Sequence, residues 1–62
     1  MDLGLYLKKS NILLKDMAKA IPCSTGALSN YVHKRREPKR WIRNRIVEYT
    51  HGLVAHEDLL LK

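Results

Sequence analysis

The chain has 62 residues, of which 45% are hydrophobic and 29% are charged, and its formal net charge at pH 7 is +6. This length allows one small domain, residues 1–62, and excludes an elaborate pocket, while the composition is that of a folded protein. The excess of lysine and arginine indicates a polyanionic partner, with nucleic acid as the first candidate, although a small protein can also carry a basic surface without one.

The sequence contains little that could support catalysis, metal binding or membrane insertion. Cys23 is its only cysteine, which excludes an internal disulfide and suits the reducing cytoplasm. Its three histidines lack metal-ligand spacing, and Cys23 has no paired base. No apolar run reaches the roughly 18 residues of a membrane helix, and no secretion signal is recognisable. We therefore expect no enzyme, cofactor, metal or small-molecule ligand.

Two short helices are predicted at the start of the chain. Residues 3–10 have helical spacing, with Asp2 as a candidate N-cap and with Asn11 able to adopt the left-handed conformation that ends many helices. Residues 15–21 predict a second helix with one apolar face, and Pro22 ends it because proline cannot continue a helical turn. The buried face of this second helix is expected to be Met17, Ala18 and Ile21.

A third helix is predicted from Ser24, a good N-cap, to Tyr31. Ala27, Leu28 and Tyr31 form its apolar face. Exposed helical positions usually carry long charged side chains, but the other face of this helix is small and polar, which lets it approach another surface closely. That face is formed by Thr25, Gly26, Ser29 and Asn30.

The rest of the chain predicts a basic loop at residues 33–36 and a fourth helix opened by Glu37 and Pro38, with proline at its first position. Gly52 is expected to cap this helix, and residues 56–61 form either a last helical turn or an extended tail. The buried stripe of the fourth helix is expected to be Trp41, Ile42, Ile46 and Tyr49.

The segment "MAKAIPCSTGALSNY" resembles the pattern Leu-Ala-x-x-Leu-Gly-Ile-Ser-x-x-x-Val-Ser-x-Trp of helix-turn-helix repressors of the phage Cro and cI superfamily. "REP" and "YTHGLVAHEDLL" extend the similarity to small Cro-like proteins over most of the chain. The resemblance implies an all-α domain of four to five helices with a lambda-repressor-like helix-turn-helix at residues 14–31. It also implies a cytoplasmic, phage or mobile-element repressor that binds a pseudo-palindromic DNA operator as a homodimer.

Three positions depart from the family pattern. Pro22 stands where the family has a glycine with positive φ, so we expect the turn to differ locally. Leu13 and Leu14 replace a Thr-Gln pair whose glutamine typically contacts a phosphate in the family. Gly26 lies inside the third helix, where it costs roughly 0.5–1 kcal/mol relative to alanine. Close approach to DNA would explain this glycine.

In such a domain the third helix enters the major groove, where each base pair displays a distinct pattern of hydrogen-bonding groups. The expected base readers are Thr25, Gly26, Ser29 and Asn30, unless Ser29 and Asn30 are merely solvated. Cations beside the helix would grip phosphates and set affinity rather than sequence preference. The expected phosphate contacts are Lys15, Ser24, His33, Lys34, Arg35, Arg36, Lys39 and Arg40.

The apolar residues near the end of the chain outnumber what a small core can bury, so we expect some of them to meet a second subunit. A two-fold dimer would set two such helices about 34 Å apart, one turn of DNA. The alternative is that these side chains pack within their own chain. The expected dimer interface is Leu53, Val54, Leu59, Leu60 and Leu61.

Two other functions remain open from the sequence. The arginine-rich segment 34–45 could grip RNA, and Trp41 could stack on a base, although its spacing with Ile42 and Tyr49 favours a core or interface role. An antitoxin-like or anti-repressor module is the other alternative, because Leu13, Leu14 and the C-terminal leucines could hold a protein partner.

Overall fold

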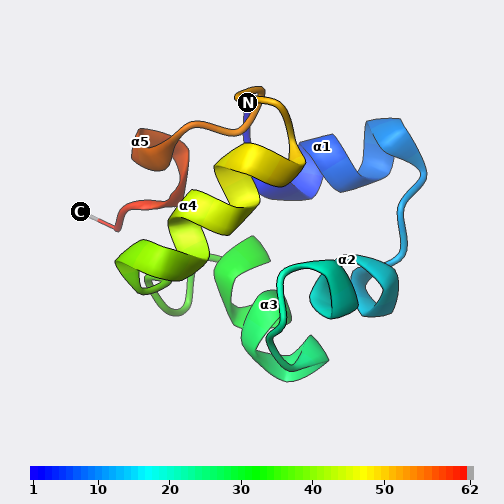
Figure 1. The fold of residues 1–62 in the computed structure, drawn as a ribbon, viewed down its shortest axis with the longest axis horizontal. Helices are drawn as coiled ribbons and strands as arrows, with labels where there is room; N and C mark the ends of the chain where they lie inside the picture. Colours follow the sequence, from blue (N-terminus) through cyan, green and yellow to red (C-terminus); the bar gives the residue numbers. More distant parts are fainter. Residues whose placement is uncertain (62) are drawn as a thin grey trace.

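A computed structural model describes residues 1–61, and Lys62, the last residue of the expected domain, lies outside them. The described residues form the helices α1 (Leu3–Ser10), α2 (Leu14–Ala20), α3 (Thr25–Val32), α4 (Arg40–Tyr49) and α5 (His56–Leu59). In Figure 1, α2 and α3 lie side by side, α5 packs on α4, and α1 lies against α3. The prediction of an all-α domain of four to five helices is confirmed.

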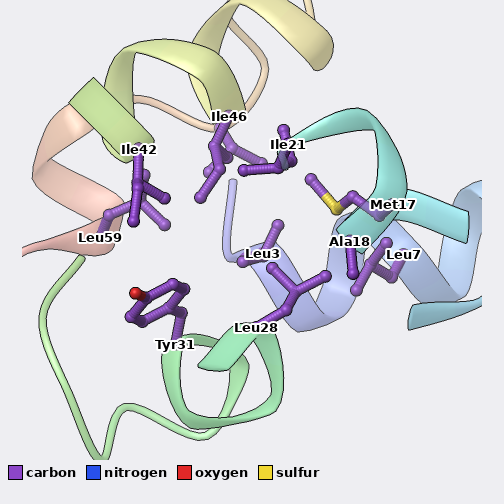
Figure 2. Packing of buried hydrophobic residues seen from close by; sticks show 11 residues of the cluster. Leu3, Leu7, Met17, Ala18, Ile21, Leu28, Tyr31, Ile42, Ile46 and Leu59 are labelled. Atoms are coloured by element: carbon purple, nitrogen blue, oxygen red, sulfur yellow. The ribbon is translucent and has the colours of Figure 1, made fainter. Parts of the chain in front are cut away.

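The core lies between the helices and takes side chains from all of them (Figure 2). The radius of gyration is 10.0 Å, close to the ~10.5 Å of a compact chain of this length. Each fully buried aliphatic side chain contributes about 1.5–3 kcal/mol relative to an exposed one, so these contacts dominate the stability of the fold. The predicted inward faces of α2 and α3 are confirmed, with Met17, Ala18, Ile21, Leu28 and Tyr31 buried and Ala27 partly buried against the core.

The predicted buried stripe of α4 is wrong at Trp41, whose exposed fraction is 49%. Ile42 and Ile46, four residues apart, fix the face of α4 that meets the core, and both are buried. Trp41 precedes Ile42 by one residue and is therefore rotated by about 100° around the helix, toward solvent. Tyr49 is partly buried and packs against the core.

The helices α1 to α4 all end with a residue of positive φ and the same type of backbone hydrogen bond. The residue that turns the chain has a positive φ each time, at Asn11 (56°), Pro22 (26°), Lys34 (57°) and His51 (54°). The N–H of the next residue then donates to the carbonyl five positions earlier, as in Cys23 to Ala18, 3.1 Å, and Gly52 to Val47, 2.9 Å. This is the Schellman pattern, which satisfies carbonyls that the end of a helix leaves free.

Several helix boundaries differ from the prediction, among them the ends of α2, at Ala20, and of α3, at Val32. α2 begins at Leu14 rather than at residue 15, with Leu13 as an N-cap that makes no side-chain hydrogen bond. α4 begins at Arg40, with Lys39 as its N-cap, and Pro38 is buried ahead of it, where its carbonyl accepts a hydrogen bond, 2.8 Å, from the Arg43 guanidinium.

The end of α4 also differs in detail. The helix ends at Tyr49, and His51 rather than Gly52 is its first left-handed residue, while Gly52 follows with a φ of 81°. The buried Thr50 hydroxyl donates to the Ile46 carbonyl, 2.9 Å, and accepts from the Val54 N–H, 3.1 Å. Thr50 thereby fixes the chain that leads to α5, whose single turn precedes an extended residue, Leu60.

Pro22 itself has a positive φ of 26°. Ile21 is buried beside it, and the Cys23 N–H is bonded to the Ala18 carbonyl. These two features accompany a positive φ at Pro22, although the pyrrolidine ring favours a φ near −65°. The short connection between α2 and α3 is therefore kept at the expense of backbone strain.

Candidate nucleic-acid interface

The small polar face predicted for the third helix, which we call the polar face of α3, lies on the outside of the molecule. Ser24 caps the helix, because its hydroxyl accepts a hydrogen bond from the Ala27 N–H, 3.0 Å. Leu28 and Tyr31 anchor the opposite side in the core. The face itself consists of Thr25 and Gly26, which are exposed, and Ser29 and Asn30, which are half-buried.

Gly26 is not required by the packing of the chain itself. A Cβ atom built on Gly26 meets no other heavy atom within 4 Å, and the residue is exposed in the first turn of α3. A glycine in a helix is unfavourable compared with alanine, and no intramolecular contact here offsets that cost. The position therefore leaves the α3 backbone open to close approach from outside.

Cations lie in the sequence on both sides of this face. Lys15 is exposed on α2, and the segment 33–40 directly follows α3. Within residues 1–61, no ion pair neutralises the exposed side chains of Lys15, Arg35, Arg36, Lys39 and Arg40. Such cations attract a polyanion most strongly when no carboxylate competes for them. Ser24 and His33, also expected at phosphates, are exposed at the two ends of α3.

Lys34 differs from the other expected phosphate contacts because it already has partners in its own chain. Its ammonium lies 3.5 Å from an Asp2 carboxylate oxygen and donates to the Asp58 carbonyl, 3.2 Å. Its side chain is still about half exposed, at 53%. A phosphate at Lys34 would therefore have to compete with these weak surface contacts.

Arg43 belongs to the arginine-rich segment 34–45, but its position is structural. Its guanidinium donates to the Pro38 carbonyl, lies 3.7 Å from a Glu37 carboxylate oxygen, and belongs to a side chain that is only 17% exposed. The other Glu37 oxygen accepts the Leu61 N–H, 3.0 Å. Helical spacing could have indicated this role, because Arg43 lies three residues before the buried Ile46 and seven before the buried Thr50.

The predicted dimer interface is wrong for two of its residues. Val54 and Leu59 are 0% and 5% exposed and belong to the core, where they pack within their own chain and cannot meet a second subunit. Leu53, Leu60 and Leu61 remain exposed. Leu13, suggested for a protein partner, is also exposed, at 58%, whereas Leu14 is half-buried against the core.

Cys23 lies in the connection between α2 and α3 and is partly buried against the core. Burial raises the pKa of the Cys23 thiol above its ordinary value. The thiolate, not the thiol, is the nucleophile, so a raised pKa makes this sulfur less reactive at neutral pH. Its contribution is packing beside the polar face of α3.

In the described part of the chain, residues 1–61, no three histidine, cysteine or acidic side chains are grouped to hold a metal ion. None of the helices α1 to α5 has the length and apolar character required to cross a membrane. Comparisons with protein-family models, with curated proteins and with solved structures find no match to this chain, so a function has to be inferred from its own surface.

Proposed function

We propose that this protein is a sequence-specific DNA-binding protein that uses α2 and α3 as a helix-turn-helix and inserts α3 into the major groove. The observation that carries the proposal is the polar face of α3, with Gly26 open to solvent and small hydrogen-bonding side chains around it. Among these, an asparagine can bond adenine bidentately, and serine or threonine can serve either member of a base pair.

The surroundings of the face support DNA rather than a neutral partner. Lys15, Arg35, Arg36, Lys39 and Arg40 are exposed and make no ion pair within residues 1–61. Contacts between such cations and phosphates release counterions, so they supply affinity that does not depend on sequence. In the proposed complex the polar face of α3 adds the sequence preference and the cations position the helix.

We further propose that the protein acts in the cytoplasm as a Cro-type repressor, a homodimer that occludes a promoter on a pseudo-palindromic operator. Leu53, Leu60 and Leu61 are exposed and available for self-association. A two-fold dimer would place two α3 helices one DNA turn apart, about 34 Å. The proposed activity is binding and requires no catalytic group.

The test is selection of preferred sites from random duplexes by the full-length protein, followed by competition against random duplex at physiological salt. We expect a preferred site bound roughly a thousandfold or more tightly than random duplex, with two half-sites about 10 base pairs apart. Equal binding of selected and random duplex would refute the proposal.

Matched variants separate base reading from phosphate binding. Ser29→Ala with Asn30→Ala should remove the preference for the selected site and spare the weak binding of random duplex. Arg35→Ala should weaken binding to both duplexes and lower the salt dependence. Ser10→Ala is the control, because Ser10 is exposed at the end of α1 and away from the polar face of α3 in the sequence.

A further inference from the structure

The outer face of α4, which we define as Arg40, Trp41, Asn44, Arg45 and Glu48, has no other element of the described chain on it. All of these residues are exposed, whereas Ile42 and Ile46 turn the opposite face into the core. Residues three and four positions apart are neighbours on a helix, so Asn44 and Arg45 flank Trp41 on this surface. A half-exposed tryptophan thus stands beside a guanidinium.

The charge of this face disfavours a second copy of the chain as its partner. The face carries two arginines and one acidic residue, Glu48, and Lys39, the N-cap of the helix, adds a further cation. In a two-fold contact a face meets itself, so the guanidinium groups of one subunit would oppose those of the other. A polyanion with a flat apolar group is the complementary ligand for an exposed indole between arginines.

We propose that the outer face of α4 binds single-stranded nucleic acid, with an unpaired base stacked on Trp41 and the neighbouring phosphates against Arg40 and Arg45. Stacking on a side chain requires a base whose face is free, and a continuous duplex hides that face against the next base pair. This site is distinct from the polar face of α3 and does not depend on the function proposed for that face, although Arg40 is also one of the cations proposed to contact duplex phosphates.

Trp41 can report on this binding directly because it is the only tryptophan in the chain. We would titrate the protein with a 12-nucleotide RNA of mixed sequence, with DNA of the same sequence, and with random duplex DNA, while recording tryptophan emission. Single strands should quench the emission by stacking, and random duplex should leave it nearly unchanged. A larger effect of RNA than of DNA would assign part of the contact to the 2′-hydroxyl.

Variants then test whether the indole contributes to affinity. Trp41→Leu should weaken binding of the labelled single strand about fivefold to a hundredfold, whereas Trp41→Tyr should bind nearly as the parent does. The Ser29→Ala and Asn30→Ala pair should leave this binding intact. Circular dichroism of each variant checks the fold, which these changes should spare because Trp41 is half exposed.

Three results would overturn the inference. One is unchanged emission of Trp41 when single strands bind, and another is equal affinity of the leucine variant and the parent. The third is an emission change on simple concentration of the protein without nucleic acid, which would assign the face to self-association. None of these results bears on whether α3 prefers a selected duplex, so the two proposals can fail separately.

Discussion

At Pro22 the backbone follows a path that suits glycine better than proline. Its φ of 26° is far from the value near −65° that the pyrrolidine ring favours. Proline also lacks the N–H that would bond a carbonyl of the last turn of α2 at this position of a Schellman end. Only the Cys23 N–H, bonded to the Ala18 carbonyl at 3.1 Å, remains to close the turn.

Pro22→Gly should therefore raise the free energy of unfolding by about 1 kcal/mol or more, because relief of strain and a new N–H outweigh the greater freedom of glycine in the unfolded chain. Urea unfolding followed by circular dichroism measures this change. Pro38→Gly is the matched control. Pro38 is buried and has no positive φ, so that variant should be less stable than the parent. A Pro22→Gly variant that loses stability would contradict the strain at this turn.

On the scale of the element, Gly26 is expected to affect both the stability of α3 and its binding to DNA. Gly26→Ala should raise the free energy of unfolding by up to about 1 kcal/mol, because alanine favours the helix and its Cβ meets no atom within 4 Å. The same methyl group projects from the polar face and should weaken binding to a selected duplex. Thermal unfolding and a binding titration on one preparation measure both effects.

Opposite signs for the two effects are the decisive result for Gly26. If Gly26→Ala is more stable and binds the selected duplex as tightly as the parent, the α3 backbone does not approach DNA closely at this position. Ala20→Gly provides the reverse control, since Ala20 is exposed in the last turn of α2. That change should lower stability.

The elements whose ends carry local signals were predictable from the sequence. Asp2 accepts from the Leu5 N–H and Ser24 from the Ala27 N–H, so the caps that open α1 and α3 could be identified from residue type alone. Asn11 likewise has the predicted left-handed conformation. The polar face of α3 was also predictable, because the apolar residues on the opposite side of this helix have clear helical spacing.

Features that depend on distant segments were not predictable in this way. Trp41 was expected inside because of its helical spacing with Ile42 and Tyr49, but the segments packed against α4 bury Ile42 and Ile46 and leave Trp41 exposed. The burial of Val54 and Leu59 depends likewise on how the end of the chain returns to α4. The positive φ of Pro22 was not predictable either, because the preference of its ring points the other way.

At the scale of the whole molecule, the two ends of the described chain are joined electrostatically. The Met1 amino group lies 2.8 Å from Asp58 Oδ2 and donates to the Leu53 carbonyl, also at 2.8 Å. The Met1 ammonium, followed by the Ala55 N–H, holds the pKa of Asp58 below its ordinary value. The contact connects the start of α1 with α5 and so helps to close the fold.

A lowered pKa in the folded state means that Asp58 adds stability above its unfolded pKa, and that this contribution is lost as the pH falls through the folded pKa, below about 4. Asp58→Asn should therefore lower the Tm at pH 7, and the gap to the parent should be smaller at pH 3. Thermal unfolding followed by circular dichroism at both pH values measures the difference in Tm between variant and parent and how that difference changes with pH.

Asp16→Asn is the control for this pH effect, because Asp16 is exposed on α2 and makes no ion pair within residues 1–61. It should lower the Tm at pH 7 less than Asp58→Asn does, because it removes only a charge in the first turn of α2. If the gap between Asp58→Asn and the parent is as large at pH 3 as at pH 7, the ionised carboxylate is not what connects the ends of the chain.

Because α1 to α4 end in the same way, different residue types can be compared at equivalent positions of one protein. Asparagine, lysine and histidine occupy one backbone conformation, at Asn11, Lys34 and His51, in a single molecule, and proline stands at the corresponding position after α2 with a φ of 26°. Asparagine and histidine tolerate this conformation better than most residues, and proline tolerates it least. Replacing each residue in turn by glycine would rank side-chain types within one chain, with the smallest gain in stability at Asn11 and the largest at Pro22.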